Sequence, residues 1–207
     1  MGRRTPLYDA HVAAGARIVD FAGWDMPVHY GSQIQEHHAV RGGAGMFDVS
    51  HMCITDLVGE QAEAFLRQLL ANDVAKLETE GRALYSCMLN ARGGVLDDLI
   101  VYLLGPGRYR AVVNAGTRDK DLAWIREHAA PHGVEVRERL DLGMIAVQGP
   151  RARELVHGLL PADLAASAPE LARFSAAWSG DWMVARTGYT GERSEERRVG
   201  KECIVKC

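Results

Sequence analysis

The sequence lacks the features that mark several classes of protein. Its four cysteines among 207 residues are too few for a disulfide scaffold. No apolar run approaches the roughly 18 residues of a membrane helix, and the first 15 residues contain no apolar segment of the signal-peptide kind. The net charge of −3 argues against binding of nucleic acid through bulk positive charge. We therefore expect partners other than nucleic acid or a membrane.

Metal-ligand spacing is also missing. His37 and His38 are adjacent, so on a helix their rings would project from different faces and would not share a metal ion. No other grouping of cysteine and histidine has convincing spacing. The sequence therefore predicts no metal cofactor.

Helical and strand patterns alternate irregularly along the chain. Residues 60–70 carry an apolar stripe typical of a helix, and residues 118–130 carry a second one with Thr117 as N-cap. A third helix is expected after Gly149-Pro150, with Pro150 at its first position, and 162–173 reads as a loop or short helix. Residues 15–30 are expected to form a strand followed by irregular chain, and strands are also expected at 44–58, 84–116 and 178–189. This order predicts an α+β fold with antiparallel sheets and flanking helices.

The most informative segment is 84–116. Two turns, at Asn90–Gly94 and Gly105–Gly107, bound a strand that contains VLDDLIVYLL. Alternation puts Asp98 on the same face as Ile100 and Tyr102, and Asp97 on the opposite face.

If the second turn closes on Leu104 and Arg108, Asp98 lies opposite Asn114. Tyr85, on the preceding strand, then lies within about one position of Asp98. A carboxylate, an amide and a phenol would converge on one face, although a slip of one residue would separate them. An alternative stays open at this point: the Asp-Asp pair is solvated or caps a turn.

Several long segments occur in an order that resembles one family, the aminomethyltransferase (T-protein) of the glycine cleavage system, with bacterial members most similar. The resemblance runs from about residue 4 to residue 192. The segments are VDFAGWDMPVHYGSQIQEHHAVR, GMFDVSHM, LLANDVAKL, ALYSCMLNARGGVLDDLIVY, VVNAGTRDKDLAWI, MIAVQGP and RTGYTGE.

The resemblance implies a reaction and the residues that perform it. An aminomethyl group carried on the lipoyl arm of the H-protein passes to tetrahydrofolate, giving methylenetetrahydrofolate, ammonia and the dihydrolipoyl carrier. By motif, Asp98 is the catalytic carboxylate beside the folate, which orients the attacking nitrogen or stabilises a cationic iminium. Asp97 is expected to matter little. The implied folate-site residues are Met52, Tyr85, Tyr102, Asn114 and Tyr189.

The resemblance also implies an organisation into domains and a bacterial cytoplasmic location. A discontinuous folate-binding first domain is expected at 1–55 with 142–192, and an inserted second domain at 56–141. The C-terminal β domain of the family is missing, and the chain is expected to be an incomplete and inactive fragment.

The segment 193–207 departs from the family pattern. One back-translation of 193–203 resembles a sequencing adapter, and the segment has a run of charges at Arg193–Arg198. We expect it to be non-native, and not to pack on the domain. Glu196 is not assigned the folate-binding role of the family's glutamate, because its neighbours differ.

Two other functions share this fold. A non-catalytic folate-binding module would carry a Lys-Gly-Cys-Tyr-type motif, which the sequence lacks. The folate domain of a sarcosine- or dimethylglycine-oxidising enzyme would follow a flavin-binding region with a glycine-rich fingerprint.

Overall fold

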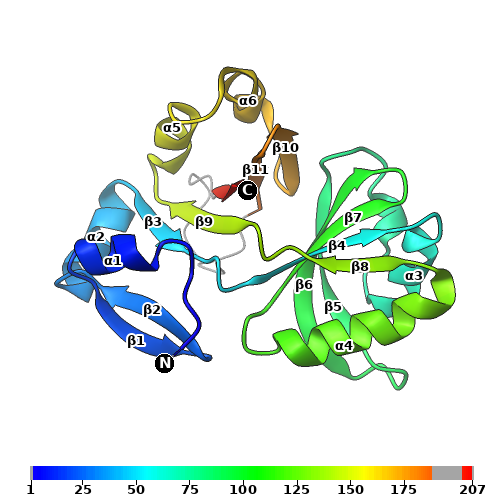
Figure 1. The fold of residues 1–207 in the computed structure, drawn as a ribbon. Coiled ribbons are helices and arrows are strands. Elements are labelled where there is room, and N and C mark those ends of the chain that lie inside the picture. The colour runs from blue at the N-terminus through cyan, green and yellow to red at the C-terminus, as the bar shows by residue number, and fades with distance from the viewer. Residues whose placement is uncertain (1, 188–201, 207) are drawn as a thin grey trace. The chain divides into compact units, whose positions relative to one another are not determined.

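The computed structural model describes residues 2–187 and the backbone of 202–206. It divides into two compact units, Met1–His51 with Leu142–Cys207 and Met52–Asp141 (Figure 1). Each unit contains a five-stranded antiparallel sheet with helices, which is the expected α+β class. In the described part of the chain no helix is both long and apolar enough to cross a membrane.

The unit Met52–Asp141 is built on a sheet in the order β5-β6-β7-β4-β8. Two helices pack on one face of this sheet (Figure 1). The strands are β4 (Cys53–Val58), β5 (Ala83–Leu89), β6 (Val95–Gly105), β7 (Arg108–Val113) and β8 (Glu135–Glu138), and the helices are α3 (Ala62–Leu69) and α4 (Arg118–Ala129), with 3-10 turns at Val74–Lys76 and Ala130–His132.

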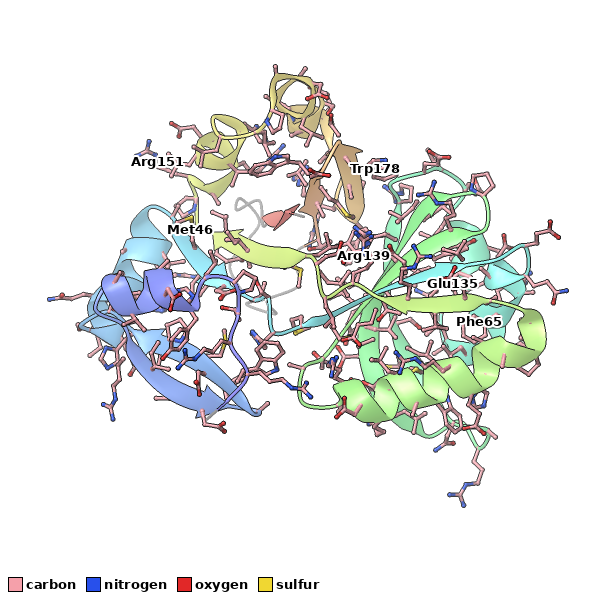
Figure 2. All side chains as sticks on the ribbon, viewed as in Figure 1. Met46, Phe65, Glu135, Arg139, Arg151 and Trp178 are labelled. Atoms are coloured by element: carbon pink, nitrogen blue, oxygen red, sulfur yellow. The ribbon has the colours of Figure 1, made fainter. Side chains whose placement is uncertain are left out.

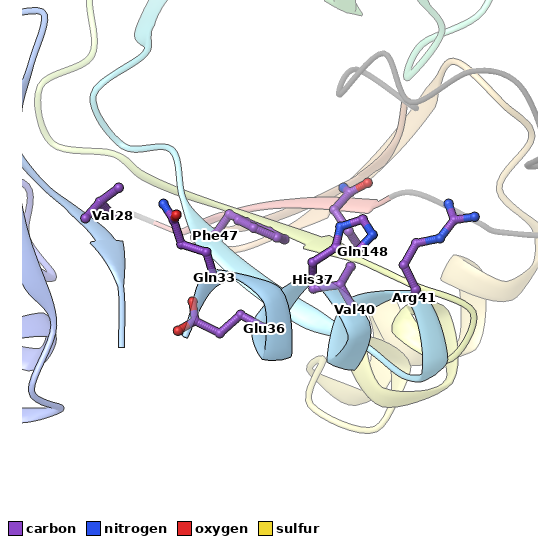
Figure 3. Close-up of a pocket in the computed structure, with 8 residues that line it drawn as sticks. All are labelled: Val28, Gln33, Glu36, His37, Val40, Arg41, Phe47 and Gln148. Carbon is purple, nitrogen blue, oxygen red and sulfur yellow. The ribbon is translucent and has the colours of Figure 1, made fainter. Parts of the chain in front are cut away.

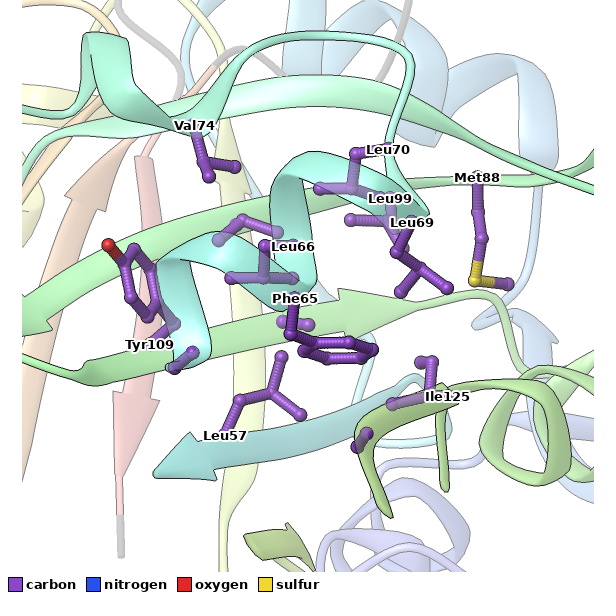
Figure 4. Close-up of a cluster of buried hydrophobic side chains, with 14 of the residues drawn as sticks. Leu57, Phe65, Leu66, Leu69, Leu70, Val74, Met88, Leu99, Tyr109 and Ile125 are labelled. Atoms are coloured by element: carbon purple, nitrogen blue, oxygen red, sulfur yellow. The ribbon is translucent and has the colours of Figure 1, made fainter. Parts of the chain in front are cut away.

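The core of this unit lies between the sheet and its two helices (Figure 4). The apolar stripe of α3 is buried as its spacing predicts, with Phe65 and Leu66 each 1% exposed. Phe65 is also labelled in Figure 2, beside α4. Leu99 and Val101 of β6 point into the same core. Each buried side chain of this size stabilises the fold by about 1.5–3 kcal/mol, so this face of β6 is firmly held.

The register of the central hairpin agrees with the sequence over most of its length. Leu99 pairs with Val113 and Leu103 with Tyr109, as the assumed pairing requires. The turn itself differs, because a bulge between Leu103 and Gly105 lets Gly105 pair with Arg108. Gly107 at the turn has a φ of +65°, and an added Cβ would lie 2.7 Å from the Gly59 carbonyl oxygen.

The other unit contains a sheet in the order β10-β11-β12-β9-β3 and a two-stranded hairpin, β1-β2. Its strands are β1 (Arg17–Phe21), β2 (Trp24–His29), β3 (Gly45–Asp48), β9 (Gly143–Gln148), β10 (Ser175–Ser179), β11 (Trp182–Arg186) and β12 (Glu202–Lys206). Its helices are α1 (Tyr8–Ala13), α2 (Gln33–Gly42), α5 (Ala152–His157) and α6 (Ala162–Ser167), with a 3-10 turn at Ala168–Glu170.

Three expectations about local structure need correction. The irregular chain expected within 15–30 is strand β2, which pairs with β1 through a turn where Gly23 has a φ of +82°. The single strand region 44–58 is two strands in two different sheets, β3 and β4. Pro150 lies two residues before α5 rather than at its first position.

The expectation that 193–207 stays unpacked is wrong for 202–206. The backbone of these residues forms β12, which pairs antiparallel with both β9 and β11. The segment contains Ile204 and Val205, β-branched residue types that favour strands. The backbone groups of β9 and β11 supply the hydrogen-bonding partners that such a strand needs.

Candidate functional site

Asp98 and Tyr85 form a direct hydrogen bond on one face of the sheet. The Tyr85 hydroxyl donates to Asp98 Oδ2 at 2.7 Å. Tyr85 pairs opposite Ile100, two residues from Asp98, which is one position further than the sequence predicted. The hydrogen bond to Asp98, helped by partial burial, raises the pKa of Tyr85 to about 12. Tyr85 therefore keeps its proton and remains a donor to the carboxylate.

Asn114 follows β7 and connects the two aspartates. Its Nδ2 lies 3.3 Å from Asp98 Oδ1, 3.1 Å from the Asp98 carbonyl oxygen and 3.0 Å from Asp97 Oδ1. All three partners are acceptors, so the amide must turn its nitrogen toward them, and its two hydrogens are shared among the three oxygens. The structure thus brings Asp98, Tyr85 and Asn114 together as the assumed register predicts, with Asp98 half-buried.

The other expected folate-site residues are Tyr102, Met52 and Tyr189. Tyr102 shares the face of Asp98 but lies four residues along β6, about 13 Å away along the strand, and it is 5% exposed. The β4–β7 ladder begins at Cys53 opposite Val113, so Met52 and Asn114 are the next residues at that end. Tyr189 lies outside the described residues.

Asp97 is more constrained than the sequence indicated. Its side chain points to the sheet face opposite that of Asp98, and α4 packs on this face with its first turn near Asp97. Asp97 Oδ2 accepts a hydrogen bond from the Thr117 hydroxyl. Thr117 is the N-cap residue of α4, as expected, but its side chain makes no capping hydrogen bond to the helix. Asp97 also meets the carboxyl of Asp121, which is fully buried. Asp97 is consequently a poor neutral reference for Asp98.

Sequence reasoning missed Asp121, although a signal was present. Asp121 falls in phase with Ile125 and Ala129, which are buried on the same face of α4. A charged residue within an apolar stripe needs a partner or must be neutral. Here the partner is Asp97, a second acid.

A second polar network lies in the other unit around Asp48, whose side chain is 0% exposed. Asp48 Oδ2 accepts hydrogen bonds from the Thr5 hydroxyl at 2.5 Å and from His11 Nε2 at 3.0 Å, and Oδ1 accepts from the Ser50 amide at 2.9 Å. Burial raises the pKa of the Asp48 carboxyl, but these donors outweigh it, so that the pKa lies below its ordinary value.

His11 extends this network to the surface. The Tyr30 hydroxyl lies 2.7 Å from His11 Nδ1, and Tyr30 is 45% exposed. The His11–Asp48 contact ties α1 to the end of β3. The network therefore joins segments that are distant in the sequence.

A third charged group lies on the Asp98 face of the sheet, on the strands β4 and β7 and at the residue that follows β8. Asp56 Oδ1 accepts from Arg110 Nε at 2.7 Å, and Oδ2 accepts from Arg139 Nη1 at 2.7 Å. Burial raises the pKa of Asp56, but the two guanidinium groups outweigh it and hold the pKa below its ordinary value. Arg139 is labelled in Figure 2 near the end of β8.

The unit that contains Asp48 also has a pocket of about 350 Å³ (Figure 3). The residues that line it are Val28, Gln33, Glu36, His37, Val40, Arg41, Phe47 and Gln148. One carboxylate oxygen of Glu36, Oε1, already accepts a hydrogen bond from the Tyr30 amide at 2.7 Å. The predicted site residues are not among these lining residues. Within the described residues, no cluster of three or more histidine, cysteine, aspartate or glutamate side chains is arranged to hold a metal ion.

The model of the GCVT N-terminal domain family matches residues 7–203. The chain belongs to this family. The matched range includes 193–203, most of the segment expected to be non-native. Within the family fold, Asp98 lies on β6 of the unit Met52–Asp141.

Relatives named aminomethyltransferase match almost the whole chain. The one from Nitrosococcus oceani is 61% identical over 196 residues, which cover 95% of this chain and 53% of the relative. The one from Stenotrophomonas maltophilia is 57% identical over 210 aligned residues, covering 99% of this chain and 57% of the relative. The chain therefore spans about half the length of these relatives.

A solved structure shows the same fold. The crystal structure of glycine cleavage system aminomethyltransferase T from Bartonella henselae is similar with a TM-score of 0.86 at 35% identity. The similarity covers all of this chain and 54% of that chain. Both comparisons agree with the resemblance to the T-protein noted from the sequence.

Proposed function

We propose that this chain is the part of a glycine-cleavage aminomethyltransferase that carries the catalytic carboxylate. The substrates are tetrahydrofolate and the aminomethyl group on the lipoyl arm of the H-protein, and the location is the bacterial cytoplasm. The proposal is supported by the names of the relatives and by one local observation: two neutral donors, Tyr85 and Asn114, hold Asp98 on a single sheet face.

The proposed chemistry requires an anion near a transient cation. As the carbon–sulfur bond breaks, sulfur departs with the electron pair and the aminomethyl carbon becomes an iminium. A folate nitrogen attacks that carbon and loses its proton, and a proton converts the departing sulfur to a thiol. Attack by a second folate nitrogen displaces the amino group, which leaves as ammonia with the proton of that nitrogen. The negative charge of Asp98 stabilises the cation, and its carboxylate accepts a hydrogen bond from the attacking nitrogen.

Tyr85 and Asn114 prepare Asp98 for this role. Each donates to a different carboxylate oxygen, so the rotation of the group is restricted. Each oxygen still has a further lone-pair position for a ligand. A carboxylate that is oriented before the substrate binds loses less entropy during the reaction.

The test needs a chain of the length of the relatives. We define the extended enzyme as residues 1–187 of this chain followed by the remainder of the Nitrosococcus oceani relative, which is 61% identical over the shared part. It should release ammonia and form methylenetetrahydrofolate from tetrahydrofolate and aminomethylated H-protein. The 207-residue chain alone should be inactive, because it spans about half of such a protein.

The variant Asp98→Asn of the extended enzyme keeps the shape of the side chain and removes its charge. Turnover should fall by roughly 10²–10⁴-fold, the usual scale for such a group. Folate affinity should change much less. Asp119→Asn is the matched control, since the side chain of Asp119 is 82% exposed and it should leave turnover unchanged. If the Asp98→Asn enzyme turns over normally, Asp98 is not catalytic. If the extended enzyme binds folate without turnover, the protein is a folate-binding module.

A further inference from the structure

A single amide links the two faces of β6. Asn114 Nδ2 lies within hydrogen-bonding distance of both Asp98 Oδ1 and Asp97 Oδ1, at 3.3 and 3.0 Å. The shorter contact is the one to Asp97. A group that acts on Asp97 therefore acts on a partner of the same amide that contacts Asp98.

Asp97 is in turn held by the first turn of α4. Thr117 donates its single hydroxyl proton to Asp97 Oδ2, and the carboxyl of Asp121 is a further hydrogen-bonding neighbour of Asp97. Together with Asn114, these groups surround Asp97 from two segments, the residue after β7 and the start of α4.

Asp121 is in an environment that does not suit a carboxylate. Its side chain is 0% exposed, and its two carboxyl oxygens are buried without a hydrogen-bond partner among the described residues. Lys120 Nζ lies 3.6 Å from Asp121 Oδ1 but donates at 2.6 Å to the Leu96 carbonyl oxygen. A proton on Asp121 changes this balance, because the group then donates to Asp97 and no longer repels it.

We propose that Asp121 is a positioning residue for Asp98: as a neutral acid it donates to Asp97, holds Asp97 as the acceptor for Asn114, and so fixes the amide that contacts Asp98. The role in catalysis rests on the proposed function, whereas the coupling between the side chains does not. Because burial and the contact with Asp97 raise the pKa of Asp121 to about 7, the proton on Asp121 is lost near neutral pH.

The charged groups around Asp121 support this direction. Asp97 faces it from β6 and opposes its ionisation, while Lys120 on α4 favours ionisation less strongly. Asp98 lies beyond Asn114 on the opposite sheet face. Loss of the proton places two adjacent carboxylates in a buried site, which moves Asp97 away from Asp121 and disturbs the Asn114 amide.

The coupling can be measured in the full 207-residue chain by NMR, with aspartate carboxyl carbons and asparagine side-chain amides labelled. In the wild type, the Asn114 amide and the Asp98 carboxyl carbon should shift in step with Asp121 as pH passes through neutrality. In Asp121→Asn, which imitates the neutral acid, this step should disappear from both signals. Asp119→Asn, on the same helical turn but exposed, should retain it.

A second variant keeps the test decisive if Asp121→Asn fails to fold. Asp97→Asn removes the neighbouring negative charge, so the midpoint of Asp121 should move toward the ordinary range of a carboxyl. The Asn114 step near neutral pH should disappear with it. If Asn114 and Asp98 stay unchanged in the wild type while Asp121 titrates, the coupling does not exist and the proposal is wrong.

Turnover of the extended enzyme separates this proposal from the proposed function. Relative to Asp121→Asn, wild-type turnover should decline by roughly tenfold between about pH 6.5 and pH 8, following the protonated fraction of a group that titrates near 7. Matching pH profiles for the two enzymes contradict a positioning role. If Asp98→Asn leaves turnover intact but the NMR coupling is present, the proposed function fails and the side-chain coupling stands.

Discussion

The two units each bury an aspartate, but they satisfy it in opposite ways. In one unit Asp48 is surrounded by donors: a hydroxyl, an imidazole and a backbone amide. In the other unit the buried aspartate, Asp121, faces a second acid, Asp97, which has donors of its own in Asn114 and Thr117. Donors lower the pKa of Asp48 despite its burial, whereas burial and the neighbouring Asp97 raise the pKa of Asp121.

Burial alone therefore does not set the charge of an aspartate in this protein. Burial raises the pKa at Asp48, Asp97 and Asp121. The number of available donors then decides the outcome, since Asp48 has enough of them and Asp121 does not. Asp48 therefore stays ionised over the physiological pH range, while Asp121 changes charge within it.

The largest effect should follow from breaking the donor-rich site. Asp48→Asn puts an amide in a place where three donors converge, so we expect the unfolding free energy of its unit to fall by roughly 3 kcal/mol. Urea unfolding of the full chain measures this loss. Asp20→Asn, an exposed aspartate of β1, should change stability by less than about 0.5 kcal/mol. Equal small effects for the two variants would mean that the Asp48 network contributes little.

The pH dependence should distinguish the two sites. Asp48 has a lowered pKa, so its stabilisation is present above about pH 4 and is lost as pH falls further. Asp121 has a raised pKa of about 7, so its stabilisation is complete below about pH 4 and is lost as pH rises toward 7.

The measurement compares unfolding free energies at about pH 4.5 and pH 7.5, the interval in which Asp121 alone of the two changes charge. Asp121→Asn should gain stability relative to the wild type as pH rises across this interval. The loss caused by Asp48→Asn should not shrink as pH falls across this interval, because Asp48 remains ionised throughout it. A constant difference for Asp121→Asn would show that Asp121 is ionised throughout.

The smallest effect should come from the exposed end of the Asp48 network. Tyr30→Phe removes the hydroxyl bonded to His11 Nδ1 at 2.7 Å, and we expect a loss of about 0.5–1 kcal/mol because Tyr30 is half exposed. Tyr8→Phe serves as the control, since the Tyr8 ring contacts Arg4 through its face, 4.0 Å from the guanidinium carbon. A loss as large as that of Asp48→Asn would indicate that His11 needs Tyr30 to hold its orientation.

Local pattern predicted the elements and the register that build the candidate site. The stripe of α3, the start of α4 and the pairing of Leu99 with Val113 all follow from short-range spacing and turn residues. These features depend on neighbours within a strand, a helix or a hairpin, and such neighbours are visible in the sequence. The α+β class and the family resemblance were confirmed for the same reason, since long contiguous motifs carry them.

The sequence did not predict contacts between segments that lie far apart along the chain. Nothing in the spacing of Thr5, His11 and Asp48 indicates that their side chains meet, because chain topology alone brings α1 to the end of β3. The pairing of β12 between β9 and β11 likewise depends on which strands have free backbone groups.

Alternation along a strand already predicts that Asp97 and Asp98 point to opposite faces. The groups that each carboxylate faces come from segments brought together by the fold. Packing of α4 against the sheet places Asp121 beside Asp97, and the end of β7 places Asn114 between the two acids. The protonation of a buried acid depends on the groups around it in space, and the fold assembles these groups from segments that the sequence keeps apart.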